Sequence, residues 1–241
     1  MPASTPPKTD TPPKTDTPPQ ADQQARGRFI TLEGSEGVGK TTNLAVIEKF
    51  LRAQGVDLVV TREPGGTALG ERIRQVLLEV AGHESEQQMH ALAELLLMFA
   101  ARAQHVETVI KPALNAGRWV LSDRFTDASF AYQGAGRQLG GKLVATLETL
   151  VQGDLRPDVT LYLDIDPDIA FERIAKRELD RIEREEREFF QRVRACYLSR
   201  AKAEPERFAV IDASLDLAVV ESAVVSALGA KLAALLNPEH D

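Results

Sequence analysis

The sequence predicts an α/β fold built on a parallel sheet, and three observations support this prediction. Short runs of aliphatic and β-branched residues alternate with longer segments whose apolar residues recur at helical spacing. One of the short runs leads straight into a glycine-rich turn that is followed by a helical pattern. The chain has 241 residues, of which 43% are hydrophobic, so it can bury one substantial core.

The alternating pattern locates the expected elements in chain order. Strands are expected at 28–32, 57–61, 119–122, 159–164 and 208–212, which makes a five-stranded sheet. Helices are expected at 40–53, 68–80, 85–116, 143–152, 168–177, 183–203 and 215–236. In sheets of this kind ligands bind beyond the carboxyl ends of the strands, so the residues that follow each strand are the first candidates for a site.

The turn after the first strand matches the phosphate-binding pattern G-x-x-x-x-G-K-[ST]. It consists of Gly34, Ser35, Glu36, Gly37, Val38, Gly39, Lys40 and Thr41. Its backbone N–H groups and the helix N-terminus can surround an anion. Lys40, expected at a solvent-facing position, would reach the β- and γ-phosphates, and the Thr41 hydroxyl would hold Mg²⁺. The flanking strand and helix favour an ATP site on a P-loop NTPase fold over a chance glycine-rich turn.

Charge and composition exclude several classes of function. The formal net charge of −7 argues against a dedicated nucleic-acid binder, which would present a basic face. The single cysteine, Cys196, cannot form an internal disulfide, and no secretory signal pattern opens the chain, so we expect a cytoplasmic protein. The apolar run 91–101 is too short to cross a bilayer and predicts a buried helix, so no membrane contact is expected.

Residues 1–26 differ from the remainder of the chain. The hexapeptide Thr-Pro-Pro-Lys-Thr-Asp occurs at 5–10 and 11–16 and again, altered, at 17–22. The segment has almost no apolar side chains to bury, which predicts a disordered tail before a catalytic domain at 27–241. A docking peptide in polyproline II conformation is the alternative.

Charged or polar motifs follow two further strands. Arg62-Glu63-Pro64-Gly65-Gly66-Thr67 follows the second strand, and Asp123-Arg124-Phe125 follows the third, with Tyr132-Gln133-Gly134 a little later. Each motif alone is compatible with a solvated turn or a surface ion pair. Together they stand at the edge of the sheet where the phosphate-binding loop lies.

These motifs, with Glu36 inside the loop and the segments 97–102, 106–114 and 178–183, resemble thymidylate kinase. Gly37 stands where one branch of that family carries arginine, so the resemblance is to the bacterial-type branch. It implies a P-loop kinase that transfers the γ-phosphoryl group of ATP to dTMP with Mg²⁺. It also implies a homodimer, which is common in the family.

The resemblance assigns roles around the acceptor phosphate and sugar. Arg62 and Arg124 would bind the dTMP phosphate, with Glu63 and Pro64 on the same side. Asp123 would order Mg²⁺, directly or through water, and the acceptor phosphate. The Glu36 carboxylate would accept a hydrogen bond from the sugar 3′-hydroxyl, and the ring of Tyr132 would exclude a 2′-hydroxyl.

The thymine base would be read by a second group of residues. The resemblance makes Phe99 the ring that stacks on the base and Arg102 the donor to a base carbonyl, with Ser129 and Gln133 at the thymine edge. Phe99 and Arg102 are three residues apart where the family places four, so Met98 is the alternative stacking position.

The segment 173–187 is rich in charge and follows the fourth strand, where a kinase lid is expected. Arg177 and Arg181 are the candidates for a catalytic lid arginine, and the chain is one residue shorter than usual before Glu178. An exposed helix with weak ion pairs between neighbouring turns is the alternative.

Two other functions share the phosphate-binding loop. A regulatory P-loop NTPase that reads guanine would need an Asn-Lys-x-Asp element, which the sequence lacks. A deoxynucleoside kinase that phosphorylates thymidine is the closer alternative, but it would not need arginines directed at an acceptor phosphate. The preference between dTMP and dUMP is left open.

Overall fold

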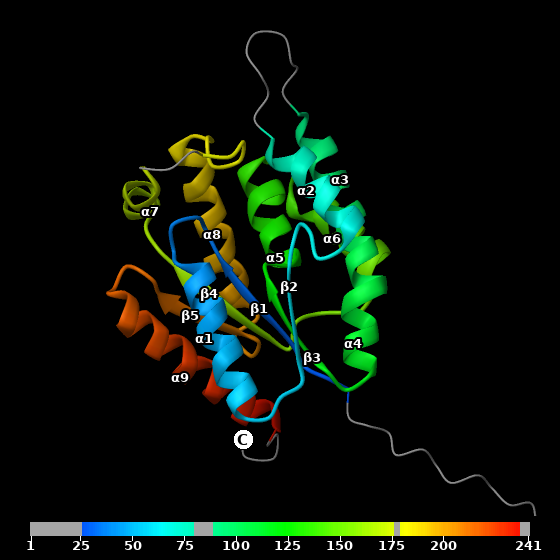
Figure 1. The fold of residues 1–241 in the computed structure, drawn as a ribbon. Coiled ribbons are helices and arrows are strands. Elements are labelled where there is room, and N and C mark those ends of the chain that lie inside the picture. The colour runs from blue at the N-terminus through cyan, green and yellow to red at the C-terminus, as the bar shows by residue number, and fades with distance from the viewer. Residues whose placement is uncertain (1–25, 80–88, 176–178, 237–241) are drawn as a thin grey trace, which may run out of the picture.

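The computed structural model describes residues 26–79, 89–175 and 179–236, and its centre is a five-stranded parallel sheet (Figure 1). The strands are β1 (Phe29–Gly34), β2 (Leu58–Arg62), β3 (Trp119–Asp123), β4 (Val159–Asp164) and β5 (Phe208–Asp212). Their order across the sheet is β2-β3-β1-β4-β5. The α/β fold and the five strands are confirmed; the bounds of β4 and β5 match the prediction, and those of β1, β2 and β3 differ by one or two residues.

Helices connect the strands and cover both faces of the sheet (Figure 1). They are α1 (Lys40–Ala53), α2 (Ala68–Leu78), α3 (Ala91–His105), α4 (Lys111–Asn115), α5 (Thr126–Ser129), α6 (Gly141–Gln152), α7 (Pro167–Ile174), α8 (Arg187–Ala203) and α9 (Leu217–Leu236). Two stretches are π-helical, η1 (Val106–Ile110) and η2 (Phe130–Gly136). Neither α5 nor η2 was expected from the sequence.

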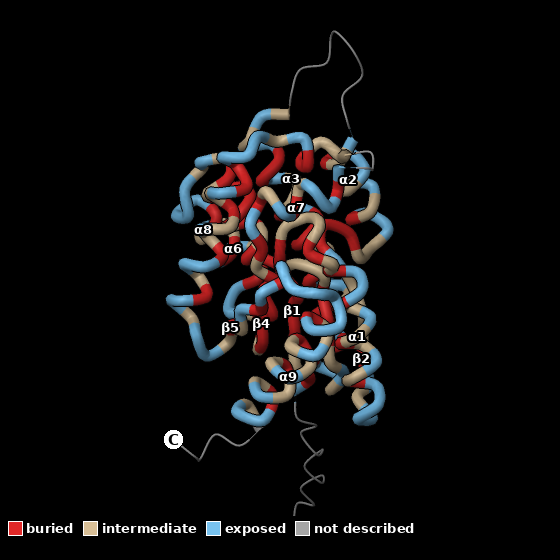
Figure 2. Tube along the Cα trace, turned by 90° about the vertical axis from the view of Figure 1, so that its left-hand side faces the viewer, coloured by how far each residue is buried: buried red, intermediate tan, exposed pale blue. Residues whose placement is uncertain are grey.

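Successive side chains along a strand point to opposite faces of the sheet, so the hydrophobic core is divided between these two faces. Ile30 and Leu32 of β1 pack with α1 and α9, whereas Phe29 packs with η1 and α4. On β4, Tyr162 faces α8. Figure 2 shows the result, a buried centre enclosed by exposed helix surfaces.

The helix expected at 85–116 is divided in the structure, and its first residues, 85–88, lie outside the described part of the chain. From Ala91 the chain is α-helical to His105, π-helical from Val106 and α-helical again from Lys111. Pro112 has no backbone N–H to give to the carbonyl four residues earlier, so the regular ladder cannot continue through this point.

The helix expected at 183–203 begins only at Arg187. The Asp180 carboxylate accepts hydrogen bonds from the backbone N–H groups of Ile182 and Glu183, both at 2.9 Å. Such local bonds hold the chain in a turn and compete with a helix. The ends of the helices expected at 68–80 and 168–177 fall partly outside the described residues.

Among the described helices, α9 is the one long and apolar enough to cross a membrane by length and composition. Its window Leu217–Leu235 has a mean hydropathy of 1.6, and 22% of it is buried. This stretch, and not 91–101, is therefore the most extended apolar segment. Val220, Val224 and Leu228 of α9 pack into the core beside β4 and β5, which is how a core-covering helix behaves.

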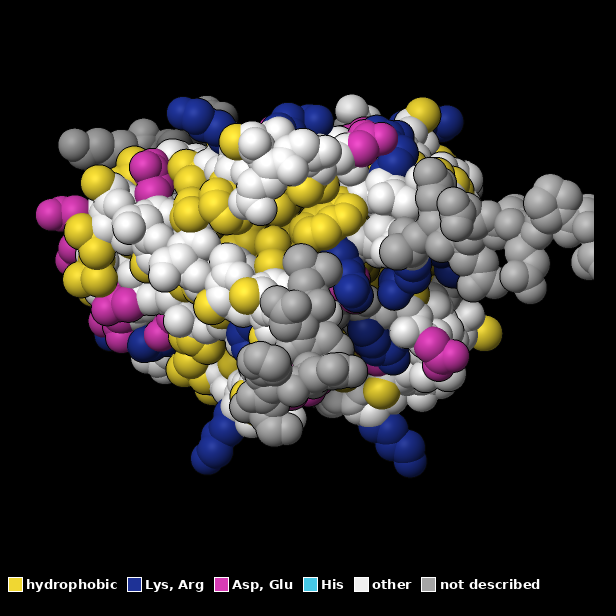
Figure 3. Space-filling model, turned by 90° about the horizontal axis from the view of Figure 1, so that it is seen from below, with side chains coloured by type: hydrophobic (Ala, Val, Ile, Leu, Met, Phe, Trp, Pro, Cys, Tyr) yellow, Lys and Arg dark blue, Asp and Glu magenta, His cyan; other side chains and the backbone are white. Residues whose placement is uncertain are grey.

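The two ends of the sheet differ in character. Figure 3 shows the end where the strands begin, with an apolar patch surrounded by side chains of both charges. The opposite end, where the strands finish, carries the phosphate-binding loop and the motifs at the strand ends.

Candidate active site

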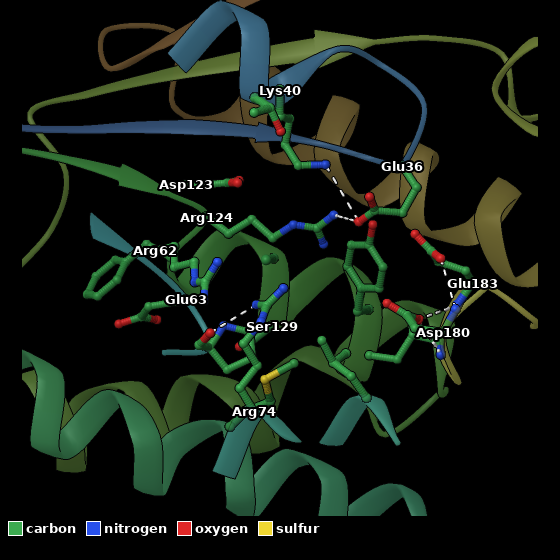
Figure 4. A pocket seen from close by; sticks show the side chains of 18 of the residues that line it. Glu36, Lys40, Arg62, Glu63, Arg74, Asp123, Arg124, Ser129, Asp180 and Glu183 are labelled. Atoms are coloured by element: carbon green, nitrogen blue, oxygen red, sulfur yellow. Dashed lines mark hydrogen bonds and ion pairs between the residues drawn. The ribbon is translucent and has the colours of Figure 1, made fainter. Parts of the chain in front are cut away.

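A cavity of about 510 Å³ opens at the carboxyl ends of β1, β2 and β3. The parallel register pairs Arg62 with Asp123 and Asp123 with Leu32, so the ends of three strands lie side by side. The motifs from distant parts of the sequence therefore share one cavity (Figure 4).

The phosphate-binding loop has the conformation that its glycines permit. Gly37 and Gly39 have φ of 76° and 81°, in the left-handed region, and α1 begins directly after Gly39. A Cβ on Gly37 would lie 2.8 Å from the carbonyl oxygen of Ala170 in α7. Glu36, Gly37, Gly39, Lys40 and Thr41 line the cavity. The predicted Gly34, Ser35 and Val38 do not line it: the carbonyl oxygens of Gly34 and Ser35 accept from Lys40, and Val38 packs into the core.

Lys40 does not face solvent, as the sequence suggested, but is 8% exposed. Its ammonium group donates to the carbonyl oxygens of Gly34 at 3.2 Å and Ser35 at 2.8 Å. Burial lowers the pKa of Lys40 and nearby Arg124 lowers it further, although Glu36 opposes both. Because phosphate oxygens would attract this ammonium group, a bound triphosphate would favour its charged form.

Besides Arg102, which is described below, three arginines line the cavity from other elements. Arg62 ends β2 and pairs with Glu71 at 2.8 Å, and Arg124 follows β3. The third, Arg74 of α2, was not predicted because no motif marks it. It donates to the carbonyl oxygen of Pro64 at 3.0 Å, and burial, Arg62 and Arg124 lower its pKa. Only the packing of α2 against the turn brings Arg74 to the cavity.

Glu36 is the counter-ion of Lys40 and Arg124. Its carboxylate pairs with the Arg124 guanidinium and lies 3.6 Å from the Lys40 ammonium group (Figure 4). The Arg124 guanidinium also lies 4.8 Å from the centre of the Tyr132 ring. The predicted bond from Glu36 to a sugar hydroxyl stays a prediction.

Arg124 has a strained backbone, with φ of 69° in the left-handed region. Three hydrogen bonds hold this conformation. Arg124 N–H donates to the Leu32 carbonyl at 3.0 Å, and the Ser122 hydroxyl donates to the Arg124 carbonyl at 2.7 Å. The Phe125 N–H donates to the buried carboxyl of Glu33 at 2.8 Å.

Asp123 and Thr41 are the residues suited to a divalent cation. Asp123 Oδ1 is buried and has no hydrogen-bond partner among the described residues, and both side chains border the cavity. Mg²⁺ is usually held by one or two carboxylates together with substrate phosphates rather than by an all-protein cage. No cluster of three or more metal-ligating side chains occurs in the described part of the chain, and a site completed by phosphates needs none.

Arg102 of α3 also lines the cavity, and hydrogen bonds from its guanidinium to three neighbours hold it in place. Its Nε donates to Glu63 at 2.7 Å, and one terminal nitrogen donates to Ser129 Oγ at 3.0 Å and the Phe125 carbonyl at 3.2 Å. The other terminal nitrogen, NH1, is buried without a partner in the described structure. Because Arg102 lines the cavity, a ligand is the available acceptor.

The prediction that Phe99 stacks on a base is wrong in this structure. Phe99 is 2% exposed, packs with Leu95 and Val144, and does not line the cavity. Its ring centre lies 4.6 Å from the Arg102 guanidinium, so it supports that residue as a cation–π partner. Met98, the alternative, lines the cavity. The helical rotation between adjacent residues turns the two side chains to different faces of α3.

Tyr132 and Gln133 line the cavity from η2. The Gln133 amide N–H donates to Glu94 of α3 at 2.8 Å, and Gln133 Oε1 is buried with no partner in the described residues. Gln133 is therefore oriented to accept a hydrogen bond from a ligand rather than to donate one. Sequence reasoning did not foresee the role of Glu94.

The lid arginines are only partly described. Arg177 lies outside the described residues. Arg181 does not face the phosphate-binding loop, because it donates to Glu94 at 2.7 Å and to the carbonyl oxygen of Leu77 at 2.8 Å. Arg173 lies beside the loop, with its guanidinium 3.5 Å from the Gly37 carbonyl oxygen and 2.8 Å from that of Ala213.

Comparisons with known proteins agree with this arrangement. The family model described as Thymidylate kinase matches residues 32–224. The chain is 54% identical over 207 residues to a thymidylate kinase of Teredinibacter turnerae, covering 86% of this chain and 99% of that one. It is 55% identical over 200 residues to a thymidylate kinase of Nitrosospira multiformis, covering 83% and 95%. The crystal structure of thymidylate kinase from Ehrlichia chaffeensis matches with a TM-score of 0.67 and 34% identity, covering 85% and 99%.

The buried Glu33 generates a prediction about stability. Burial and nearby Asp127 raise its pKa to about 8, against hydrogen bonds from Tyr197 and Phe125. Between the unfolded value of 4.5 and about 8, the folded protein keeps a proton that the unfolded chain releases. The free energy of unfolding should therefore fall as pH rises through this window, by at most about 1.4 kcal/mol per pH unit.

Glu33→Gln should flatten this dependence, because its amide stays neutral. Urea unfolding of both proteins from pH 5 to pH 9 measures the difference. Parallel curves for the two proteins would show that Glu33 does not titrate in this range.

Proposed function

The chain belongs to the thymidylate kinase family, and we propose that it transfers the γ-phosphoryl group of ATP to dTMP, yielding ADP and dTDP for dTTP synthesis. The observation that carries this proposal is the convergence of Lys40 with Arg62, Arg74 and Arg124 on one cavity. Such a concentration of cations suits two phosphate groups that meet in line. A kinase for thymidine would have no acceptor phosphate to neutralise.

We assign the donor to the phosphate-binding loop. Backbone N–H groups around Gly37 and Gly39 and the Lys40 ammonium group would hold the ATP phosphates. The Lys40 bonds to two backbone carbonyls would be exchanged for phosphate oxygens. Mg²⁺, held by Thr41, Asp123 and phosphate oxygens, would supply charge neutralisation during transfer.

We assign the acceptor phosphate to the arginines opposite the loop. A guanidinium can grip two phosphate oxygens at once, which orients the acceptor oxygen as well as neutralising charge. Arg124 would exchange its ion pair with Glu36 for the dTMP phosphate. The released Glu36 carboxylate is then available to the sugar 3′-hydroxyl.

The base and sugar would occupy the apolar side of the cavity. Met98 would contact one face of thymine, Arg102 NH1 would donate to a base carbonyl, and Gln133 Oε1 would accept the base N–H. The Tyr132 ring, wedged against Phe189 with ring centres 6.0 Å apart, would leave no room for a ribose 2′-hydroxyl.

For the lid we propose a division of roles among its arginines. Arg181 would fasten the lid to Glu94 and Leu77, as its bonds indicate. A cation for the transferring phosphoryl group would come from Arg173, which already lies at the phosphate-binding loop, or from Arg177. We also propose that residues 27–241 form the catalytic domain and act without the 1–26 segment. The protein would work in the cytoplasm and bind neither membrane nor nucleic acid.

The first test is the reaction itself. The protein with ATP, Mg²⁺ and dTMP should form ADP, and thymidine in place of dTMP should not support turnover.

Lys40→Ala should lower kcat by about 10²-fold or more, because charge on the transferring oxygens loses a buried partner. A coupled ADP assay measures both, and turnover of thymidine but not dTMP would favour the nucleoside kinase.

Met98 and Phe99 can be separated by substitution. Met98→Ala should raise the KM for dTMP several-fold with little change in thermal stability, because Met98 faces the cavity. Phe99→Ala should destabilise the protein by about 3–5 kcal/mol, the usual loss for a buried phenylalanine. Steady-state kinetics and thermal unfolding of both variants measure the contrast, and the reverse pattern would restore Phe99 as the stacking residue.

We further propose a homodimer through α3 and α6. Leu92 and Leu96 of α3 are 38% and 50% exposed, and Leu143 and Leu150 of α6 are 37% and 77% exposed. The two helices pack together through Leu95, Phe99 and Val144, so an interface on these leucines would be continuous and apolar. Sedimentation equilibrium should give a dimer mass, and Leu96→Glu combined with Leu150→Glu should give a monomer. A monomeric unmodified protein at micromolar concentration would contradict this.

A further inference from the structure

His105 connects the turn after β2 with the base side of the cavity. It is the last residue of α3, fully buried, and does not line the cavity. Its Nδ1 lies 2.9 Å from Glu63 Oε1, and its Nε2 lies 2.7 Å from the hydroxyl of Thr61. Both ring nitrogens are therefore used inside the protein.

Glu63 is shared between His105 and Arg102. One carboxylate oxygen meets His105, and the other accepts from Arg102 Nε at 2.7 Å. Burial alone would raise the pKa of Glu63, but Arg102 and His105 outweigh it and lower the pKa. The ionised carboxylate can only accept, so Nδ1 of His105 carries the proton and donates.

The turn after β2, which includes Pro64 and Gly66, packs directly against the His105 imidazole. Gly66 has φ of 74°, and a Cβ at this position would lie 2.5 Å from His105 Nε2 and 2.6 Å from Thr61 Oγ1. His105 therefore occupies the space beneath the turn that presents Pro64 to the cavity. Any movement of the ring would disturb the Glu63 carboxylate and this turn together.

The orientation of the Arg102 guanidinium depends on Glu63, which accepts a hydrogen bond from its Nε edge. Phe99 and Phe125 lie 4.6 Å and 5.1 Å from its central carbon and restrict tilting of the plane. Rotation within the plane is set by hydrogen bonds, of which the bond from Nε to Glu63 is the shortest, at 2.7 Å. This rotation decides where NH1, the nitrogen without a partner in the described residues, is directed.

We propose that His105 is a positioning residue for acceptor recognition: it orients Glu63, and through Glu63 it directs Arg102 NH1 toward the base of the nucleotide. The inference rests on the proposed function, because it concerns how dTMP is read. His105 itself touches no substrate. Its loss should weaken binding of the acceptor and leave the ATP side unaffected.

Three substitutions at one position separate the two ring nitrogens. The side-chain amide introduced by His105→Asn can donate from near the Nδ1 position, whereas His105→Gln places its amide near the Nε2 position, and His105→Leu has neither. His105→Leu and His105→Gln should raise the KM for dTMP about tenfold, the usual effect of losing a bond to a charged group. His105→Asn should stay close to the unmodified enzyme. In all three the KM for ATP and kcat should be little changed.

A double-substitution cycle tests the route through Arg102. In the Arg102→Met background, where the guanidinium is gone, His105→Leu should cause little further rise in the KM for dTMP. Thr61→Val, which removes the bond to Nε2 only, is the matched control and should leave this KM unchanged.

The outcomes separate this inference from the proposed function. If the unmodified enzyme does not phosphorylate dTMP, the proposed function fails first. If it does, equal effects of the Asn and Gln substitutions, fully additive effects of His105→Leu and Arg102→Met, or a parallel change in the KM for ATP would overturn the role of His105.

Discussion

Electrostatic repulsion among the cations that share the cavity constrains the whole site. Lys40, Arg74 and Arg124 are brought to one cavity, and burial together with neighbouring arginines lowers the pKa of Lys40 and Arg74. Glu36 relieves part of this repulsion by pairing with Lys40 and Arg124. Phosphate groups would relieve it further, so charges that repel one another would favour binding of two phosphorylated nucleotides.

The strained turn at Arg124 shows how the sheet supports this charge. A left-handed arginine is unfavourable by itself, and bonds to Leu32, Ser122 and Glu33 hold it in place. All three partners belong to β1 or β3, the two adjacent strands that lie beside the phosphate-binding loop. The position of Arg124 is therefore tied to the strand that carries the loop, which would keep the proposed donor and acceptor sites in register.

The side of the cavity that we propose for the base is built on buried polar networks. Glu63 and Glu94 are both almost fully buried, and each serves several partners. Glu63 joins α3 to the turn after β2, and Glu94 joins α3 to η2 and to Arg181. Among the residues of these networks that line the cavity, Arg102 and Gln133 each have one buried polar atom without a partner in the described structure. A buried donor and acceptor left in this way favour the ligand that satisfies both.

Local sequence patterns were enough to predict the α/β class, the phosphate-binding loop and the strand ends where Arg62, Asp123 and Arg124 lie, because parallel strands of such a sheet present their carboxyl ends at one edge. Which side chains reach the cavity depends instead on how the helices pack. Arg74 carries no motif and arrives through packing of α2, while Phe99 turns inward beneath Arg102 and leaves Met98 at the surface of the cavity. Such choices depend on helix rotation and on contacts between segments far apart in the chain, which no local pattern encodes.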